Sequence, residues 1–342
     1  MAGYDLHSGD YIGTSEDELW SLFTYVFSDA SIKTSTYKFA LIKSICDQIY
    51  DLREENGVYF ISRFKLFERF TENYWNLVSK YNLKQMKYNG KSQCSRVERI
   101  IIDAISKYSL PREIYFHSVK PKERDEIVNQ VADECSEYVI DALCTDFTGK
   151  LYSYELEKGI YVGKEAHAFI SKYKNEIEKL NYYAWGKMLE DINDGPVTEK
   201  LLSKLDDAVP QRSDLSVYSN ILFNVMNINE CFYCKNELND GMHVDHFIPW
   251  TFMKTDNLWN FVLSCPKCNQ AKSDDLLDMS FVNKIENQNN EILRNKKMHP
   301  LIEREFSNYE NGLIRRVWQY ARMSGYKVIT IKQLKKRKSK KN

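Results

Sequence analysis

The chain of 342 residues lacks the long apolar run that a membrane-spanning helix requires, about twenty consecutive residues. Residues 1–7 carry neither the basic nor the apolar segment of a secretion signal. No internal repeat or low-complexity linker occurs, and the 48 basic and 48 acidic side chains cancel to a formal net charge of zero. These absences favour a globular protein without a membrane segment, and we expect it to lie in the cytoplasm.

The chain does contain enough apolar sequence for a sizeable core, with 43% hydrophobic and 13% aromatic residues. Apolar residues recur at helical spacing, as in Leu41, Ile42, Ile45 and Ile49 after Thr34. Helices are predicted from Thr34, over Phe60–Leu83, over Glu123–Cys144 with Ile127, Val131, Cys135, Tyr138 and Ala142 on one face, and over 164–180, 181–192, 213–226 and 303–324. A β-hairpin is predicted for Leu151–Val162, with its turn at Lys158 and Gly159.

Two cysteine pairs have the spacing of metal-binding turns. Cys231 and Cys234 form one C-x-x-C pair, and Cys265 and Cys268 form another. Four thiolates make a closed tetrahedral site, so they predict a structural Zn²⁺. The alternatives are four core cysteines with chance spacing, or a disulfide framework.

The other cysteines show no pairing pattern, which disfavours a disulfide framework and fits a reducing compartment. They are Cys46, Cys94, Cys135 and Cys144. Cys46 and Cys135 lie on apolar helical faces and are expected in the core.

The segment between the two cysteine pairs carries groups suited to phosphodiester cleavage. Asp245 and His246 are adjacent, so an extended strand points them to opposite faces. A carboxylate is a hard ligand for Mg²⁺ or Mn²⁺, and a neutral imidazole can take a proton from water. Asn269, directly after the second pair, offers an amide oxygen to the same cation. A base and a cation together are what such a reaction needs.

Three stretches resemble the HNH family of nucleases, which share a ββα-metal finger: His243–Pro249, Asp256–Leu263 and Cys265–Ser273. The resemblance implies that Asp245 binds the metal and His246 is the general base. It also implies that Asn260 holds the catalytic loop and that Asn269 completes the metal shell. The cysteine pairs match the cysteine-bearing branch, and the first part of the chain weakly resembles uncharacterised bacterial HNH proteins.

Several neighbouring residues have two readings. His243 shares a strand face with Asp245 and either assists the metal or phosphate, or is a surface imidazole. Lys272 is either a phosphate contact or a solvated lysine. Asn257 is a rival to Asn260 as the structural asparagine. Core packing rather than base stacking is expected of Trp250, Phe252 and Trp259.

The charge of the chain is distributed unevenly. Residues 279–342 hold sixteen Lys/Arg and five Asp/Glu, a net of +11, and the last twelve residues contain seven basic side chains. Such a segment favours a phosphate-binding surface, and its alternative is a solubilising tail. The candidates for nucleic-acid contacts are Lys272, Arg315, Arg316, Arg322, Lys335, Lys336 and Arg337. The predicted helix 303–324 is expected to pack on the finger through Phe306, Leu313 and Trp318.

The sequence therefore predicts a mainly α protein with a large helical N-terminal region, a small zinc-stabilised ββα-metal finger and a basic helical C-terminal segment. The expected domains are 1–210, of unknown role, with target recognition or partner docking as candidates; 211–280, the HNH nuclease domain; and 281–342, the basic helices and tail.

The expected function is a metal-dependent HNH endonuclease that hydrolyses DNA, with RNA the weaker candidate. Its expected setting is bacterial antiviral defence or restriction, with another defence-system protein as a candidate partner. The alternatives are a homing or mobile-element nuclease, and a non-catalytic zinc-dependent module that binds nucleic acid.

Overall fold

The chain folds into two compact units, Met1–Pro210 and Gln211–Asn342. The structure is a computed structural model that describes residues 8–9, 13–87, 94–193, 198–207, 215–238, 241–295, 299–307 and 309–340. The predicted boundary at Pro210–Ser213 lies outside these residues, and the division into three functional parts stays a prediction. Among the described helices, none is both long and apolar enough to span a bilayer.

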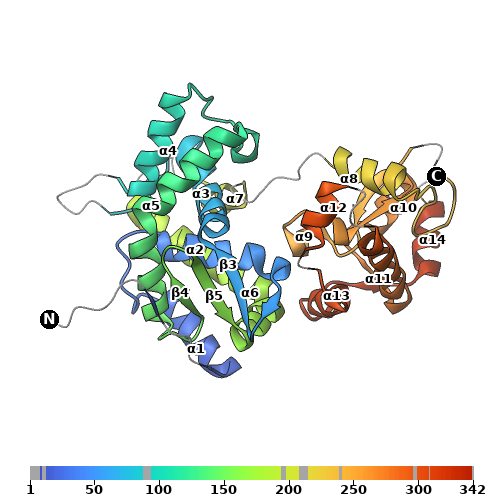
Figure 1. Ribbon diagram of the computed structural model, residues 1–342, viewed down its shortest axis with the longest axis horizontal. Helices are drawn as coiled ribbons and strands as arrows, with labels where there is room; N and C mark the ends of the chain where they lie inside the picture. The colour runs from blue at the N-terminus through green and yellow to red at the C-terminus, as the bar shows by residue number, and fades with distance from the viewer. Residues whose placement is uncertain are drawn as a thin grey trace. The chain divides into compact units, whose positions relative to one another are not determined.

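Unit 1 is built of long helices around one small antiparallel sheet (Figure 1). Its helices are α1 (Glu16–Phe27), α2 (Tyr37–Gln48), α3 (Arg63–Ser79), α4 (Arg96–Lys107), α5 (Pro121–Asp146), α6 (Lys164–Ile192) and α7 (Leu201–Asp207). Its strands are β1 (Ser8–Gly9), β2 (Glu54–Glu55), β3 (Val58–Ser62), β4 (Tyr152–Glu155) and β5 (Gly159–Gly163), in the order β1-β4-β5-β3-β2.

The predicted hairpin is present as β4 and β5, with Tyr152 opposite Val162. The sequence did not reveal that β5 also pairs with β3 across five residue pairs. Gly159, at φ +143°, sits where an added Cβ would collide with the Ile61 carbonyl oxygen, so this close approach of strands requires glycine. The sequence analysis therefore missed that the predicted hairpin belongs to a five-stranded sheet.

The sheet also corrects two helix predictions. The helix predicted from Phe60 begins at Arg63, because Phe60 lies in β3 and the Ser62 hydroxyl caps the first turn of α3 by accepting from the Lys65 amide. The helices predicted over 164–180 and 181–192 form one helix, α6, with non-helical dihedral angles at Tyr173. Tyr138, predicted on the buried face of α5, is 59% exposed.

Charged residues occur in the helical core of unit 1. Lys43 and Asp47 lie one turn apart on α2 and form an ion pair, and Lys174 and Glu178 do the same on α6 at 2.7 Å. Lys43 Nζ also lies 3.6 Å from Glu178 Oε1, which joins the two helices. All four side chains are at most 8% exposed. Two positive and two negative charges thus compensate one another inside the unit.

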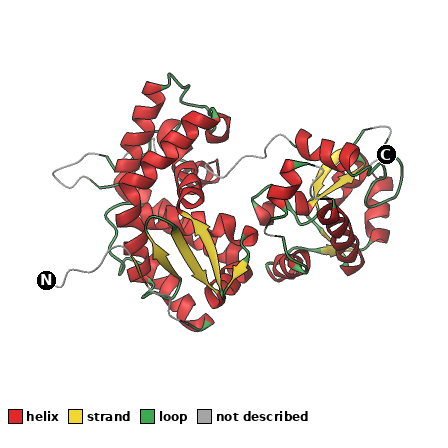
Figure 2. Ribbon diagram, in the orientation of Figure 1, coloured by secondary structure: helices red, strands yellow, loops and turns green. Residues whose placement is uncertain are grey.

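Unit 2 contains the ββα finger and the helices that surround it (Figure 2). Its elements are α8 (Ser216–Asn220), the π-helix η4 (Ile221–Val225), β6 (His243–His246), α9 (Trp250–Met253), the 3-10 helix η5 (Leu258–Asn260), β7 (Phe261–Ser264), α10 (Pro266–Lys272), β8 (Leu276–Leu277), α11 (Met279–Arg294), α12 (Pro300–Glu305), α13 (Leu313–Met323), β9 (Val328–Ile329) and α14 (Ile331–Lys340). β6 and β7 pair antiparallel and lead into α10, so the predicted ββα arrangement is confirmed.

The helix predicted over 303–324 is two helices, α12 and α13. The break ends at Gly312, whose φ of +85° lies in the left-handed region and interrupts a right-handed helix. The apolar residues expected to pack are nevertheless buried, and the Trp318 indole donates a 2.8 Å hydrogen bond to the Leu277 carbonyl of β8. Buried Phe306 and Leu313 belong to the same unit as the finger.

Two further segments differ in detail from their predictions. The helix predicted over 213–226 is α8 followed by a π-helical turn, with residues 213 and 214 outside the described part of the chain. The basic tail is itself a helix, α14, and it packs against α10 with Leu334 fully buried. The C-terminal segment is therefore part of the structure around the finger.

Candidate metal centre and catalytic pocket

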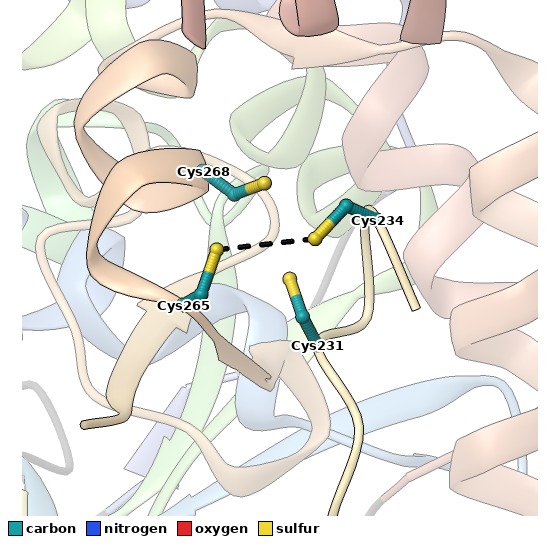
Figure 3. A group of neighbouring side chains, drawn as sticks. All are labelled: Cys231, Cys234, Cys265 and Cys268. Carbon is teal, nitrogen blue, oxygen red and sulfur yellow. Dashed lines mark hydrogen bonds between the residues drawn. The ribbon is translucent and has the colours of Figure 1, made fainter. Parts of the chain in front are cut away.

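The four predicted cysteines converge from two backbone turns. Cys231 and Cys234 lie on a turn before β6, whereas Cys265 precedes α10 and Cys268 lies in its first turn. Figure 3 shows the four sulfurs pointing toward one another, and all lie within 4.8 Å of each other. Zn–S bonds of about 2.3 Å in a tetrahedron put sulfurs about 3.8 Å apart. The 3.9 Å between the Cys234 and Cys265 sulfurs fits that spacing.

The backbone fixes the first turn before any metal is considered. The Lys235 amide donates to the Cys231 carbonyl at 2.9 Å, and the Cys231 amide donates to the Asn236 carbonyl at 2.8 Å. The Phe232 amide donates to the Leu263 carbonyl of β7, which ties the first turn to the strand before the second. The fold therefore brings both cysteine pairs to one point.

The close contact of the thiols shifts their pKa values. Hydrogen bonding with Cys268 lowers the pKa of Cys231 to about 4, and the same contact raises the pKa of Cys268. Thiolate is the form that binds metal. Four sulfur donors without an open position fit a structural zinc.

A lysine of the C-terminal helix reaches this cluster. Lys338 Nζ of α14 lies 3.3 Å from the Cys234 sulfur and 3.6 Å from the Cys265 sulfur. Burial lowers the pKa of Lys338, but hydrogen bonding to Cys234 and the nearby thiols outweigh it, so the pKa stands above its ordinary value. The ammonium therefore stays charged and stabilises thiolates.

Asp245 lies on β6 and is 7% exposed. Its Oδ2 accepts a 2.5 Å hydrogen bond from the Tyr233 hydroxyl, and Lys272 Nζ lies 3.4 Å from the same oxygen. Burial raises the pKa of Tyr233 well above its usual range, and the charge of Asp245 raises it further, so the phenol stays protonated and donates. The carboxylate is held in one orientation by a neutral donor and a cation.

Lys272 does not fit either reading from the sequence. It is 1% exposed, and its Nζ donates to the His246 carbonyl oxygen at 2.8 Å in addition to its contact with Asp245. The solvated-lysine reading is wrong, and a phosphate contact would require the ammonium to leave these partners. Lys272 therefore holds the side chain of Asp245 and the backbone of His246 in place.

His246 is paired with a carboxylate that the sequence analysis did not single out. Its Nε2 lies 2.7 Å from Asp256 Oδ1, and the imidazole is 7% exposed. Asp256 comes ten residues later, within the stretch that resembles the HNH family, so its position in that stretch was the only sequence signal. The pair holds the ring so that Nδ1 is the nitrogen left to take a proton.

Asn269 and His243 lie side by side. Asn269 Nδ2 lies 3.1 Å from His243 Nδ1, with His243 exposed and Asn269 half-buried. When the amide nitrogen faces the imidazole, the amide oxygen is the atom left for a cation. His243 therefore orients the amide of Asn269.

Asn260 fits the role of the structural asparagine better than Asn257. It is fully buried, its Oδ1 accepts from the Ile248 amide at 2.8 Å, and its Nδ2 donates to the Ile248 carbonyl at 2.9 Å. Asn257 is also buried, but its Oδ1 accepts from Thr255 two residues away. Asn260 is thus the residue that fastens the segment after His246.

A pocket of about 280 Å³ collects the candidate catalytic groups. Asp245, His246, Asn269 and Lys272 all line it. Trp250, expected in the core, also lines this pocket and is half-buried, whereas Phe252 and Trp259 are buried as expected. The pocket therefore joins a carboxylate, an imidazole and an amide, which is a set able to bind a hard cation and move a proton.

The basic candidates divide into paired and exposed residues. Arg315 pairs with Glu286 at 2.7 Å, Arg316 pairs with Glu310, and Arg337 pairs with Asp275. Arg322, Lys335 and Lys336 are exposed. Their roles in nucleic-acid binding stay a prediction, and the exposed residues suit it better.

Comparison with known proteins supports the reading of the finger. Residues 231–275 match the family model described as HNH endonuclease, which spans both cysteine pairs and the pocket-lining residues between them. No curated protein and no solved structure matches the chain. The match lies within unit 2.

Proposed function

We propose that unit 2 is a metal-dependent endonuclease that hydrolyses phosphodiester bonds in DNA. The observation that carries the proposal is buried His246, which lines one pocket of the HNH finger together with Asp245 and is paired with half-buried Asp256. A general base oriented by a carboxylate, next to a hard-cation ligand, is the arrangement that phosphodiester hydrolysis uses.

The donor set fits a Mg²⁺ or Mn²⁺ ion. Asp245 and the amide oxygen of Asn269 would hold it, since both are oxygen ligands of the kind these cations prefer. A bound cation stabilises the charge on the phosphate and on the departing oxygen. Tyr233 and Lys272 orient the Asp245 carboxylate for that role, and His243 turns the Asn269 amide.

His246 moves the proton. Asp256 accepts the hydrogen of Nε2, so Nδ1 takes a proton from the attacking water. The water oxygen forms a bond to phosphorus as the bond from phosphorus to the 3′ oxygen breaks. The positive charge of the imidazolium that results forms 2.7 Å from the Asp256 carboxylate. As the HNH resemblance implies, the products carry 5′-phosphate and 3′-hydroxyl ends.

The test is a cleavage assay on the purified full-length chain. Plasmid, linear duplex, single-stranded DNA and RNA are incubated with Mg²⁺, with Mn²⁺, or in buffer freed of divalent ions. We expect DNA to be cut only when metal is added, and we expect His246→Ala to cut at background level. The zinc content of each sample is measured alongside, because a chelator that removed the structural ion would abolish activity by unfolding the finger.

The outcome against the proposal is equally concrete. A zinc-loaded wild-type protein that cuts no DNA with either cation would point to the non-catalytic module that binds nucleic acid. The pairing of buried His246 with half-buried Asp256 argues against that module, because a surface that only binds DNA gains nothing from a desolvated imidazole.

For the biological setting we propose bacterial antiviral defence or restriction. Unit 1 is a large helical module outside the HNH match, which suits sensing or docking of another defence-system protein. Mapping the cut ends separates this setting from a homing or mobile-element nuclease, since a homing nuclease would cut at one long site.

A further inference from the structure

Unit 1 contains a cavity of about 640 Å³ between α2, α4 and α5. Sites for small organic ligands usually have volumes of about 300 to 1,000 Å³. The cavity lies far along the chain from the finger, in the unit that the family match does not cover. It is therefore a candidate binding site separate from the nuclease pocket.

The cavity has a buried apolar floor and an exposed apolar rim. Cys135 is fully buried and Val139 is 1% exposed, whereas Ile32 is 81% exposed and Tyr138 is 59% exposed. Exposure of large apolar side chains to water around a cavity is unfavourable, and a bound ligand that covers them would remove this cost. The floor and rim together favour a ligand with a flat apolar part.

Four cations line the same cavity. They are Lys33, Lys38, Arg96 and Arg99, and Glu134 is the one acid among the lining residues. The lining residues carry a net charge of +3, of which Asp146 offsets one by pairing with Lys38 at 2.6 Å, so two positive charges remain in excess. Cationic side chains gathered around an apolar floor favour an anionic ligand.

Lys33 and Arg99 keep hydrogen-bond donors for a ligand, whereas the three donors of Lys38 are taken by Ser31, Ile32 and Asp146. Lys33 donates to two backbone carbonyls, of Ser28 and Ser31, and an ammonium has three donors. Arg99 pairs with Glu134 through one nitrogen of a guanidinium that carries five N–H groups. Burial lowers the pKa of Lys33, and the charge of Lys38 lowers it further, whereas Asp146 and Asp29 act in the opposite direction.

Arg96 and Tyr138 form a flat surface at the rim. The Arg96 guanidinium carbon lies 4.6 Å from the centroid of the Tyr138 ring, and the Glu134 carbonyl oxygen accepts a 2.6 Å hydrogen bond from Arg96. Guanidinium planes and phenol rings are the surfaces on which proteins stack nucleobases. This pair thus offers a stacking surface to a nucleobase, and Lys33 and Arg99 offer donors to a phosphate.

We propose that this cavity binds a small nucleotide. The base stacks on the surface of Arg96 and Tyr138, and the phosphate is held by Lys33 and Arg99. The proposal does not depend on nuclease activity, because it concerns unit 1 alone.

Isothermal titration of the full-length, zinc-loaded chain tests it. The probes are the four nucleoside 5′-monophosphates, with the corresponding nucleosides and with octanoate as an aliphatic anion. We expect saturable binding of at least one nucleotide with one site per chain, and binding of its nucleoside at least about tenfold weaker, because charge-assisted hydrogen bonds to phosphate are lost. The absence of nucleotide binding at millimolar concentration, or binding of octanoate in place of nucleotides, overturns the proposal.

Two variants place the ligand in the cavity. Arg99→Gln removes one phosphate donor and Tyr138→Ala removes the stacking ring, and each is expected to weaken binding by about tenfold. Both side chains are more than half exposed, so neither substitution should unfold the unit. Lys107→Gln is the matched control, because Lys107 is an exposed cation on the same helix α4 outside the cavity lining. Equal affinities in all three variants would contradict the assignment.

Discussion

Buried charge has different surroundings in the two units. In unit 1, Lys43 pairs with Asp47 and with Glu178, and Lys174 pairs with Glu178, so that two cations and two anions compensate one another. In unit 2, Asp245 and His246 are buried to a similar degree, at 7% and 6% exposure, but they line a pocket. The first arrangement holds helices together, whereas the second leaves a carboxylate that can bind a metal and an imidazole that can take a proton at the wall of a pocket.

The two arrangements differ in which atoms of the buried groups remain for a ligand or a proton. A buried ion pair that is satisfied by its own partners contributes shape and helix register, and its net contribution to stability is small. Asp245 keeps a carboxylate that two neighbours orient, and His246 keeps one ring nitrogen. The four cysteine sulfurs lie within 4.8 Å of one another, and among the described residues it is Lys338 that brings a positive charge to them. As thiolates they would carry more negative charge than one ammonium compensates. Such a cluster is completed by a metal ion.

The largest expected effect comes from removing the zinc. Cys265→Ser should release the ion and unfold unit 2, because binding of structural zinc contributes on the order of 10 kcal/mol to folding. Unit 1 should keep its own unfolding transition. Elemental analysis and calorimetry measure both effects, with Cys94→Ser as the control from outside the cluster. Native protein purified without chelators that holds no zinc would contradict the assignment.

Breaking the buried ion pairs of unit 1 should cost less. Lys43→Met leaves Asp47 buried without its cation and should lower the free energy of unfolding by about 3–5 kcal/mol. Zinc content and DNA cleavage should stay unchanged. Lys43→Met with Asp47→Leu should regain most of the loss, because no unpaired charge remains. Chemical denaturation followed by circular dichroism decides, and equal stability of the single variant and the wild type would refute this interpretation of the buried charges.

The catalytic pair should show its effect in rate rather than stability. His246→Ala should lower cleavage by about a hundredfold or more, because the general base is lost. Asp256→Asn should lower it less, since the imidazole stays but loses its orienting carboxylate. His117→Ala, an exposed histidine of unit 1, is the control. Single-turnover rates with matched zinc content measure the effect, and a folded His246→Ala protein with normal rates would exclude this base.

A smaller effect is expected at the contact of α14 with the metal centre. Lys338→Met removes an ammonium that donates to two cysteine sulfurs, and hydrogen bonds to charged groups contribute about 1.5–3 kcal/mol. Transfer of zinc to a chromogenic chelator should become roughly tenfold faster. Lys336→Met, an exposed lysine of the same helix, should leave the rate unchanged. Identical transfer rates in both variants would mean that Lys338 has no hold on the site.

The smallest effect concerns DNA affinity. Lys335→Gln with Lys336→Gln removes two exposed charges, and the slope of log affinity against log salt should fall by at most about two. Affinity should fall equally for all sequences, because phosphate contacts carry no direct sequence information. Arg337→Gln should leave the slope unchanged, since Arg337 is already paired with Asp275. Fluorescence anisotropy at several salt concentrations is the measurement, and an unchanged slope in the double variant would make α14 a purely structural helix.

Point substitutions in α14 test DNA affinity more cleanly than deletion of the helix would. α14 packs on α10 and buries Leu334, so it is not a separable tail. Deleting the helix would remove Lys338 from the cysteines together with the exposed lysines. Binding and folding would then change at once.

The sequence determined the parts of the protein that depend on short-range spacing. The two C-x-x-C pairs, the adjacent Asp245 and His246, and the helical periodicity of unit 1 are local patterns, and the family match and the ββα arrangement agree with them. Such patterns are readable because backbone geometry fixes where side chains three or four residues apart must point.

The tertiary structure decided which distant side chains complete each site. Asp256 behind His246, Tyr233 on Asp245 and Lys338 at the cysteines come from separate turns, strands and helices, and spacing along the chain does not encode their meeting. The burial of Lys272 and the pairing of β5 with β3 have the same origin. Burial and hydrogen bonding depend on the whole set of neighbours that packing supplies, so they appear only when the chain has folded.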